Sequence, residues 1–179
     1  MPLFSVSYSA GVGMVNEIYI VFGEELLPAK PDVDPVDFVQ SGLGSEGDMM
    51  KALRNTDVLK PCKPAARALT GENDPEKMAR KLLSFGPKAV AMTMGAEGSL
   101  IASGESITYQ PAYRVKVVDT TGAGDAYMGG LSFALLMEWP LDRVASFANA
   151  CAALCCTRVG ARATSAGREV EALVDDAAG

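Results

Sequence analysis

Residues 118–127 read Val-Asp-Thr-Thr-Gly-Ala-Gly-Asp-Ala-Tyr, and the fold prediction rests mainly on these ten residues. A segment over 114–118, expected to be a strand, leads into it, and an apolar helical pattern over 126–137 follows. A turn with two glycines at the start of a helix leaves several backbone N–H groups without intrahelical acceptors. Those donors and the positive end of the helix dipole form a binding site for an anion such as phosphate.

Asp125 is the unusual member of this stretch, because a carboxylate in an anion-binding site repels phosphate unless it takes up a proton or faces a different chemical group. Its presence indicates a general base beside a phosphoryl group in transfer. The amides of Gly122, Ala123 and Gly124 would then stabilise the charge that develops. The alternative is that Asp119 or Asp125 only caps the helix, as aspartate often does.

The stretch resembles the C-terminal signature of the ribokinase-like (PfkB) carbohydrate kinases, which share the pattern Asp-Thr-x-Gly-Ala-Gly-Asp. The likeness covers about 57–174, and further matching stretches occur in the expected order: Leu59-Lys60-Pro61, Leu69-Thr70-Gly71, Thr93-Met94-Gly95-Ala96-Glu97-Gly98, and Asn149 through Gly160-Ala161. The resemblance implies an α/β fold, the three-layer αβα sandwich of ribokinase-like type. It also implies phosphoryl transfer from ATP, with Mg²⁺, to a hydroxyl of a sugar or nucleoside-like substrate.

The resemblance assigns further residues to cofactor binding. Thr93, Gly95 and Gly98 match a Thr-x-Gly-x-x-Gly turn that borders the nucleotide phosphates and ribose in the family. Asn149 corresponds to a residue at the adenine edge. Taken without the resemblance, the turn is more typical of a glycine-containing hairpin than of a nucleotide site, and an asparagine within a helix is commonly just exposed.

The resemblance also implies a site for a monovalent cation such as K⁺, which several relatives bind. Most of its ligands are backbone carbonyl groups, so side-chain identity tests the site only weakly. The corresponding positions in this chain are Asp119, Thr121, Cys155, Arg158, Gly160 and Thr164.

The chain departs from the family at Pro61-Cys62-Lys63-Pro64-Ala65, where relatives usually have Pro-Asn-x-x-Glu. Cys62 and Ala65 cannot hold a Mg²⁺-bound water through a carboxylate. The N-terminal half of the family fold, which carries most sugar contacts, has no match, so the chain is expected to be truncated on that side. Three interpretations remain open: an active sugar kinase, a nucleotide-binding remnant (pseudokinase), and a fragment that another polypeptide completes.

The composition of the chain argues against several classes of function. The net charge of −6 without a basic cluster argues against nucleic acid, and no apolar run reaches the roughly 20 residues that span a bilayer. The chain has no histidine, which removes Ser-His and Cys-His catalysis. Four cysteines without zinc-ligand spacing indicate free thiols in a reducing cytoplasm.

The predicted organisation is a poorly matched segment with a proline-rich linker over 1–45 and a nucleotide-binding domain over 46–179. Expected strands cover 17–23, 57–60, 88–94, 99–103, 107–110 and 114–118. Expected helices cover 46–55, 75–84, 125–137, 141–158 and 169–176, while 1–13 shows no clear period. Without the N-terminal half, apolar surface would be uncovered, which predicts a homo-oligomer.

Overall fold

A computed structural model describes residues 4–10, 16–22, 50, 53–160, 163 and 165–178. The chain forms two compact units. The first unit comprises the described residues of Met1–Thr93 together with Leu100–Ile107, and the second comprises those of Met94–Ser99 and Thr108–Gly179.

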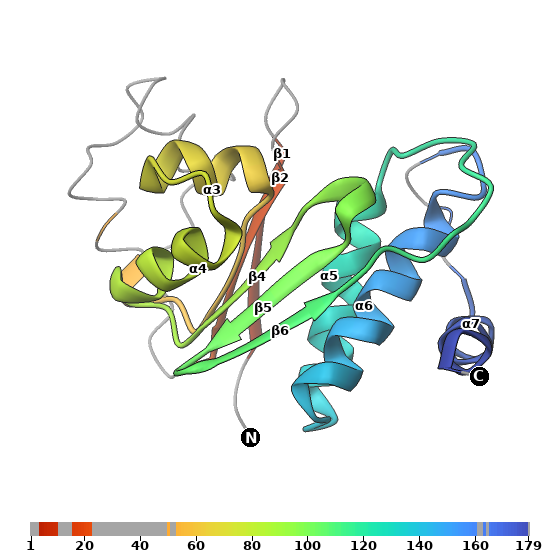
Figure 1. Ribbon diagram of the computed structural model, residues 1–179. Coiled ribbons are helices and arrows are strands. Elements are labelled where there is room, and N and C mark those ends of the chain that lie inside the picture. The colour runs from red at the N-terminus through yellow and green to blue at the C-terminus, as the bar shows by residue number, and fades with distance from the viewer. Residues whose placement is uncertain are drawn as a thin grey trace. The chain divides into compact units, whose positions relative to one another are not determined.

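The first unit is built on a six-stranded sheet in the order β1-β2-β3-β4-β5-β6 (Figure 1). Ser99 at the start of β5 and residues 108–110 at the end of β6 are assigned to the second unit. β1 pairs antiparallel with β2, β2 pairs antiparallel with β3, and β3 pairs parallel with β4. A parallel pair needs a crossover connection, and the two helices α3 and α4 provide it. The strands are β1 Phe4–Ala10, β2 Asn16–Phe22, β3 Val58–Lys60, β4 Ala89–Thr93, β5 Ser99–Ser103 and β6 Ser106–Gln110.

The crossover helices have clear local start and stop signals. Helix α4 (Pro75–Ser84) begins after Asp74, whose Oδ1 accepts a hydrogen bond of 2.9 Å from Lys77 N. Helix α3 (Lys63–Thr70) ends at Gly71, which has a φ of 71°. The two helices pack against each other and against β4, so their buried faces cover the apolar strand.

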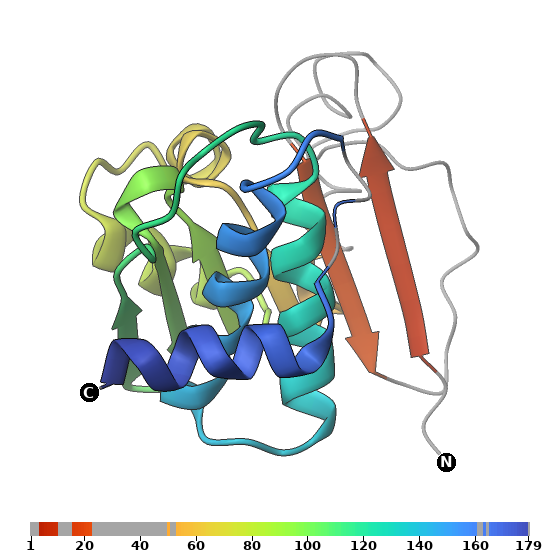
Figure 2. The ribbon, with the colours of Figure 1, turned by 90° about the vertical axis from the view of Figure 1, so that its right-hand side faces the viewer.

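The second unit contains the short 3₁₀ turn η1 (Gly95–Glu97) and three helices, α5 (Ala123–Leu136), α6 (Leu141–Cys155) and α7 (Gly167–Ala178). Helix α7 runs across the direction of α6 and contacts it (Figure 2). Helices α5 and α6 approach closely at Gly130, where a Cβ atom would lie 2.8 Å from Cys151 Sγ and 3.1 Å from Ala148 Cα. Within the described part of the chain, no helix is long and apolar enough to cross a membrane.

The structure confirms most of the predicted elements, with bounds shifted by a few residues. It confirms five of the six strands, those predicted over 17–23, 57–60, 88–94, 99–103 and 107–110, and the helices over 75–84, 125–137, 141–158 and 169–176. Residues 50, 53 and 54 are helical, as predicted for 46–55, and most of that segment lies outside the described residues. The boundary at residue 45 also lies outside them, so the division into 1–45 and 46–179 stays a prediction.

The strand predicted over 114–118 is wrong, because this segment pairs with no strand. Pro111 has no N–H to donate and follows the last residue of β6, so sheet pairing stops there. Val117 and Val118 are 60% and 52% exposed, and the Val118 amide donates to Cys156 O, at the end of α6.

Two elements were missed by the sequence analysis, β1 and α3. The β1 sequence Phe-Ser-Val-Ser-Tyr-Ser-Ala alternates with period two, which is typical of a strand and was overlooked as a region without a period. Helix α3 has a proline in its first turn and a glycine after its end, two signals that together mark a helix.

The contact at Gly130 gives a stability prediction. Gly130→Val should destabilise the protein by about 1–3 kcal/mol, because the added side chain overlaps α6. Gly129→Ala is the matched control: nothing lies within 4 Å of a Cβ there, so it should stabilise by up to about 1 kcal/mol. Urea unfolding measures both, and a Gly130→Val variant as stable as wild type would contradict the packing described.

Candidate active site

The glycine-rich stretch forms a tight turn that opens directly into α5. Gly122 adopts a left-handed conformation, with φ of 82°, and α5 begins at the next residue. A side chain rarely tolerates this conformation, which explains the glycine. Asp125 therefore lies in the first turn of α5, where it is partly exposed.

The amides of this turn are not equivalent. Ala123 N donates to Thr120 O at 3.2 Å, so this predicted donor is already engaged. Among the described residues, the amides of Gly122 and Gly124 have no acceptor. Asp125 N and Ala126 N both donate to Gly122 O, at 3.1 Å and 2.9 Å. The turn thus presents two amides and the positive end of a helix to an anion.

The carboxylate of Asp119 holds this turn in place and does not cap α5. Its Oδ1 accepts from Thr121 N and its Oδ2 accepts from Gly160 N, both at 2.9 Å. The hydrogen bonds from these two amides lower the pKa of Asp119 below its usual value. The residue before α5 is Gly122, which offers no side chain to cap the helix.

The same region connects the turn to the end of α6. Val118 N and Asp119 N both donate to Cys156 O, at 2.8 Å and 3.2 Å, and the Cys155 thiol donates to Thr121 O at 3.7 Å. Burial raises the pKa of Cys155, and its neighbours Cys156, Asp125 and Asp119 raise it further. The Cys155 thiol therefore stays protonated at neutral pH and can donate.

The structure brings four of the six residues predicted for the cation site together. Asp119, Thr121, Cys155 and Gly160 are joined by these hydrogen bonds. The Arg158 side chain forms an ion pair of 3.6 Å with Glu169, in the first turn of α7. Thr164 lies outside the described residues.

The Gly95–Gly98 turn contains two glycines with different surroundings. A Cβ on Gly98 would lie 2.0 Å from Gln110 O and 2.7 Å from Ala112 N, so close backbone packing requires this glycine. Gly95 has a φ of 59° and nothing within 4 Å of its Cβ position, so its outer face is open to a ligand. Tyr109 Oη donates to Glu97 O at 2.6 Å and braces the turn.

Asn149 is buried in α6 and its side-chain nitrogen is fully engaged. Nδ2 donates to Ser99 Oγ at 2.6 Å and to Ala145 O at 3.0 Å. Tyr127 Oη donates to the same Ser99 hydroxyl at 3.0 Å. Ser99 and Tyr127 were not predicted as site residues, although hydroxyl groups within an apolar strand and an apolar helix are a sequence signal for a buried polar contact.

The remaining predicted residues lie in the first unit. Thr93 ends β4 and its amide donates to Pro61 O at 2.9 Å, next to an isolated bridge between Cys62 and Thr93. Cys62 precedes α3 without a capping hydrogen bond from its side chain. Ala65 is only 2% exposed, so a glutamate at this position would crowd the core.

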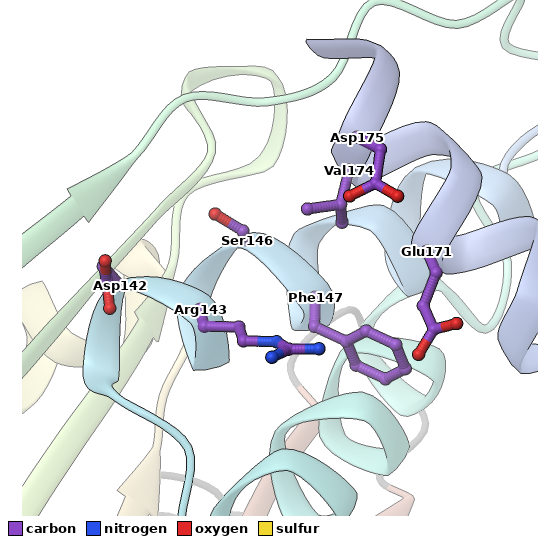
Figure 3. A pocket seen from close by; sticks show the side chains of 7 residues that line it. All are labelled: Asp142, Arg143, Ser146, Phe147, Glu171, Val174 and Asp175. Carbon is purple, nitrogen blue, oxygen red and sulfur yellow. The ribbon is translucent and has the colours of Figure 1, made fainter. Parts of the chain in front are cut away.

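A further hollow of 490 Å³ lies between α6 and α7 in the second unit (Figure 3). Phe147 and Val174 form its apolar part, and the charged side chains surround them. None of its residues was predicted as a site residue. The lining is Asp142, Arg143, Ser146, Phe147, Glu171, Val174 and Asp175.

Comparisons with known proteins identify the family. Residues 29–166 match the pfkB family carbohydrate kinase model, and the chain belongs to this family. An uncharacterized sugar kinase from Archaeoglobus fulgidus is 35% identical over 131 residues, which are 72% of this chain and 50% of the relative.

Solved structures place the fold in the same group. A protein described as ribokinase II from E. coli, in complex with ATP and Mg²⁺, superposes with a TM-score of 0.71 at 26% identity, over 82% of this chain and 47% of that one. A fructokinase double mutant from Vibrio cholerae, with fructose, ADP and potassium ion bound, superposes with a TM-score of 0.64 at 30% identity. The match covers 72% of this chain and 44% of that one. The ribokinase-like α/β fold is therefore confirmed, and the chain spans about half the length of these relatives.

The Thr121 and Gly160 amides both donate to the Asp119 carboxylate, and this arrangement, the Asp119 clamp, leads to a prediction about pH. The pKa of the Asp119 carboxyl is lower in the folded protein than in the unfolded chain, where it is about 3.9. The ionised carboxylate therefore stabilises the folded state at pH values above about 3.9, and this stabilisation is lost as the pH falls through the pKa of the folded protein. Asp119→Asn should therefore be less stable than wild type at pH 7, and the difference should vanish near pH 2.

Urea unfolding at several pH values measures this difference. Asp176→Asn, an exposed carboxylate in α7, is the matched control and should show little change at any pH. A stability deficit of Asp119→Asn that is equal at pH 7 and at pH 2 would contradict the clamp.

Proposed function

We propose that this chain binds ATP with Mg²⁺ and takes part in phosphoryl transfer to a hydroxyl of a sugar or nucleoside-like substrate. The observation that carries the proposal is the turn before α5, where the amides of Gly122 and Gly124 have no acceptor among the described residues and Asp125 stands in the adjoining helical turn. Membership of a carbohydrate kinase family and the ligands of its solved relatives support it.

In this proposal the residues of the turn have separate roles. Asp125 accepts the proton of the acceptor hydroxyl as it attacks. The Gly122 and Gly124 amides hold the charge that develops on the γ-phosphoryl oxygens. Ala123 N could join them only by giving up its hydrogen bond to Thr120 O.

The nucleotide would lie against the Gly95–Gly98 turn. Gly95 faces open space and suits close approach of the ribose or phosphates, whereas Gly98 serves the packing of the turn. Thr93 and Asn149 stay predictions, and Asn149 would have only its carbonyl oxygen to offer to adenine, because Nδ2 is engaged.

The metal ions fit the residues in different ways. The described residues contain no cluster of three or more acidic, thiol or imidazole side chains for a metal, which suits Mg²⁺ held mainly through phosphate oxygens and water. When bound, Mg²⁺ neutralises charge on the β- and γ-phosphate oxygens. A monovalent cation such as K⁺ would lie among Asp119, Thr121, Cys155 and Gly160, which the clamp brings together.

A second candidate function is nucleotide binding without transfer. Cys62 and Ala65 stand where the family resemblance predicts an asparagine near the phosphates and a glutamate near magnesium, and Ala65 is buried. The chain also spans about half of the relatives it matches. The predicted homo-oligomer stays a proposal too. The C-terminal end of α5 exposes Phe133 and Leu136, and Met137 directly after it is exposed as well, which suits a subunit contact.

Nucleotide binding is the first test. Mg-ATP and Mg-ADP at millimolar concentration should raise the melting temperature, because a ligand that binds only the folded state stabilises it. Gly122→Ala should weaken the effect, since φ of 82° disfavours a side chain, while Gly104→Ala, also at positive φ but outside the site, is the control for backbone strain. A folded wild type that does not respond to either nucleotide would refute nucleotide binding.

The role of Asp125 separates the two candidate functions. Asp125→Asn should reduce sugar-dependent ATP consumption by about a hundredfold to ten-thousandfold, the usual effect of removing a general base. Nucleotide affinity should stay unchanged or improve, because a negative charge near the γ-phosphate is removed.

A panel of ribose, fructose, ketodeoxygluconate and nucleosides with a coupled ATPase assay provides the measurement. Asp176→Asn, which removes an exposed charge from α7, should turn over at the wild-type rate. If wild type binds nucleotide but consumes no ATP with any acceptor, the binding-only function is favoured. Equal turnover of Asp125→Asn and wild type would eliminate Asp125 as the base.

A further inference from the structure

A buried polar network centred on Ser99 lies in the second unit. Ser99 is fully buried, and its hydroxyl accepts hydrogen bonds from Tyr127 Oη at 3.0 Å and from Asn149 Nδ2 at 2.6 Å. Asn149 also donates to Ala145 O at 3.0 Å, which ties the network to the backbone of α6. The Tyr127 ring is only 1% exposed.

The network joins three segments that are distant in the sequence. Ser99 follows directly after Gly98 and so lies at the end of the η1 turn. Tyr127 is two residues beyond Asp125, in the first turns of α5, and Asn149 is in the middle of α6. Any shift of the turn relative to α5 would break the bond between Ser99 and Tyr127.

Apolar side chains would fill the same space without needing partners. A buried hydroxyl that loses its hydrogen bond is costly, so a network of this kind favours one arrangement of its segments over all others. Burial raises the pKa of Tyr127 to about 12, so its phenol stays protonated and remains a donor over the whole physiological range.

We propose that Tyr127 and Ser99 are positioning residues, which hold the Gly95–Gly98 turn in a fixed place relative to Asp125 and to the Gly122 and Gly124 amides. The inference deepens the proposed function and rests on it for its consequence in nucleotide binding. Its structural part, the coupling of the turn to the start of α5, is tested without nucleotide.

Hydrogen exchange of the protein without nucleotide, followed by NMR, is the first test. The reporters are hydrogen-bonded amides in the turn (Met94, Glu97, Gly98) and at the start of α5 (Asp125, Ala126). Tyr127→Phe keeps the ring and removes the hydroxyl, and should speed exchange at both groups by about two- to tenfold, the effect of one hydrogen bond. Amides of α7 should be unaffected.

A double-mutant cycle tests whether the two residues act together. Ser99→Ala leaves both the Tyr127 hydroxyl and one Asn149 N–H without their acceptor, so it should speed exchange more than Tyr127→Phe does. Adding Tyr127→Phe to Ser99→Ala should cause no further acceleration, because the hydroxyl has already lost its partner. Tyr113→Phe removes the hydroxyl of a half-buried tyrosine outside the network; it is the matched control and should leave both reporter groups unchanged.

Calorimetric titration with Mg-ADP, well below the melting temperature of each variant, is the second test. Tyr127→Phe should weaken binding by about two- to tenfold and Tyr113→Phe by less than twofold. A loss of stability alone would lower the melting temperature without changing the affinity of the folded protein.

The outcomes separate this inference from the proposed function. If wild type does not bind Mg-ADP, the proposed function fails, and the exchange data still decide the coupling. Additive effects of the two substitutions on exchange, or unchanged exchange in Tyr127→Phe, would overturn the coupling. Unchanged nucleotide affinity in Tyr127→Phe would overturn its role in positioning the site.

Discussion

The site depends on the carboxylate of Asp119, which accepts hydrogen bonds from the amide two positions further along the chain and from the amide 41 positions further along. Thr121 N and Gly160 N each donate to one of its oxygens at 2.9 Å. This clamp fixes the turn against the segment after α6 and so holds Gly122, the residue before α5, in its left-handed conformation. Without it, the amides of Gly122 and Gly124 would have no defined direction, and Asp125 no defined place.

The clamp in turn requires α5 and α6 to lie close together. Small residues allow this, since Gly130 stands against Ala148 and Cys151 with no room for a Cβ. The close contact brings the carbonyl of Cys156 to the amides of Val118 and Asp119, and it brings Asn149 to Ser99. Burial raises the pKa of the Cys151 thiol to about 11, so this residue acts as a small apolar side chain and not as a nucleophile. Packing of two helices therefore determines the geometry of the loop.

The sequence was sufficient where local signals agree. Asp74 and Pro75 predict the start of α4, and the glycines of the signature predict the turn before α5. It failed where the outcome depends on distant partners. The alternation over 114–118 is typical of a strand, but Pro111 ends the pairing and Val118 bonds α6 instead. The bond between Tyr127 and Ser99, 28 positions apart, follows from no local pattern. Asp119 was considered as a helix cap, whereas its carboxylate accepts hydrogen bonds from the amides of two separate loops. Its part in cation binding stays a prediction.

The central claim is that the turn before α5 binds phosphate through two backbone amides. An NMR titration of ¹⁵N-labelled protein with Mg-ADP and Mg-ATP tests it most directly. If the turn binds phosphate, the Gly122 and Gly124 amide resonances shift strongly, with a further change at Gly124 between ADP and ATP, while the Gly104 and Gly129 resonances stay unchanged. Nucleotide-dependent shifts confined to other parts of the chain, with Gly122 and Gly124 unmoved, would contradict it.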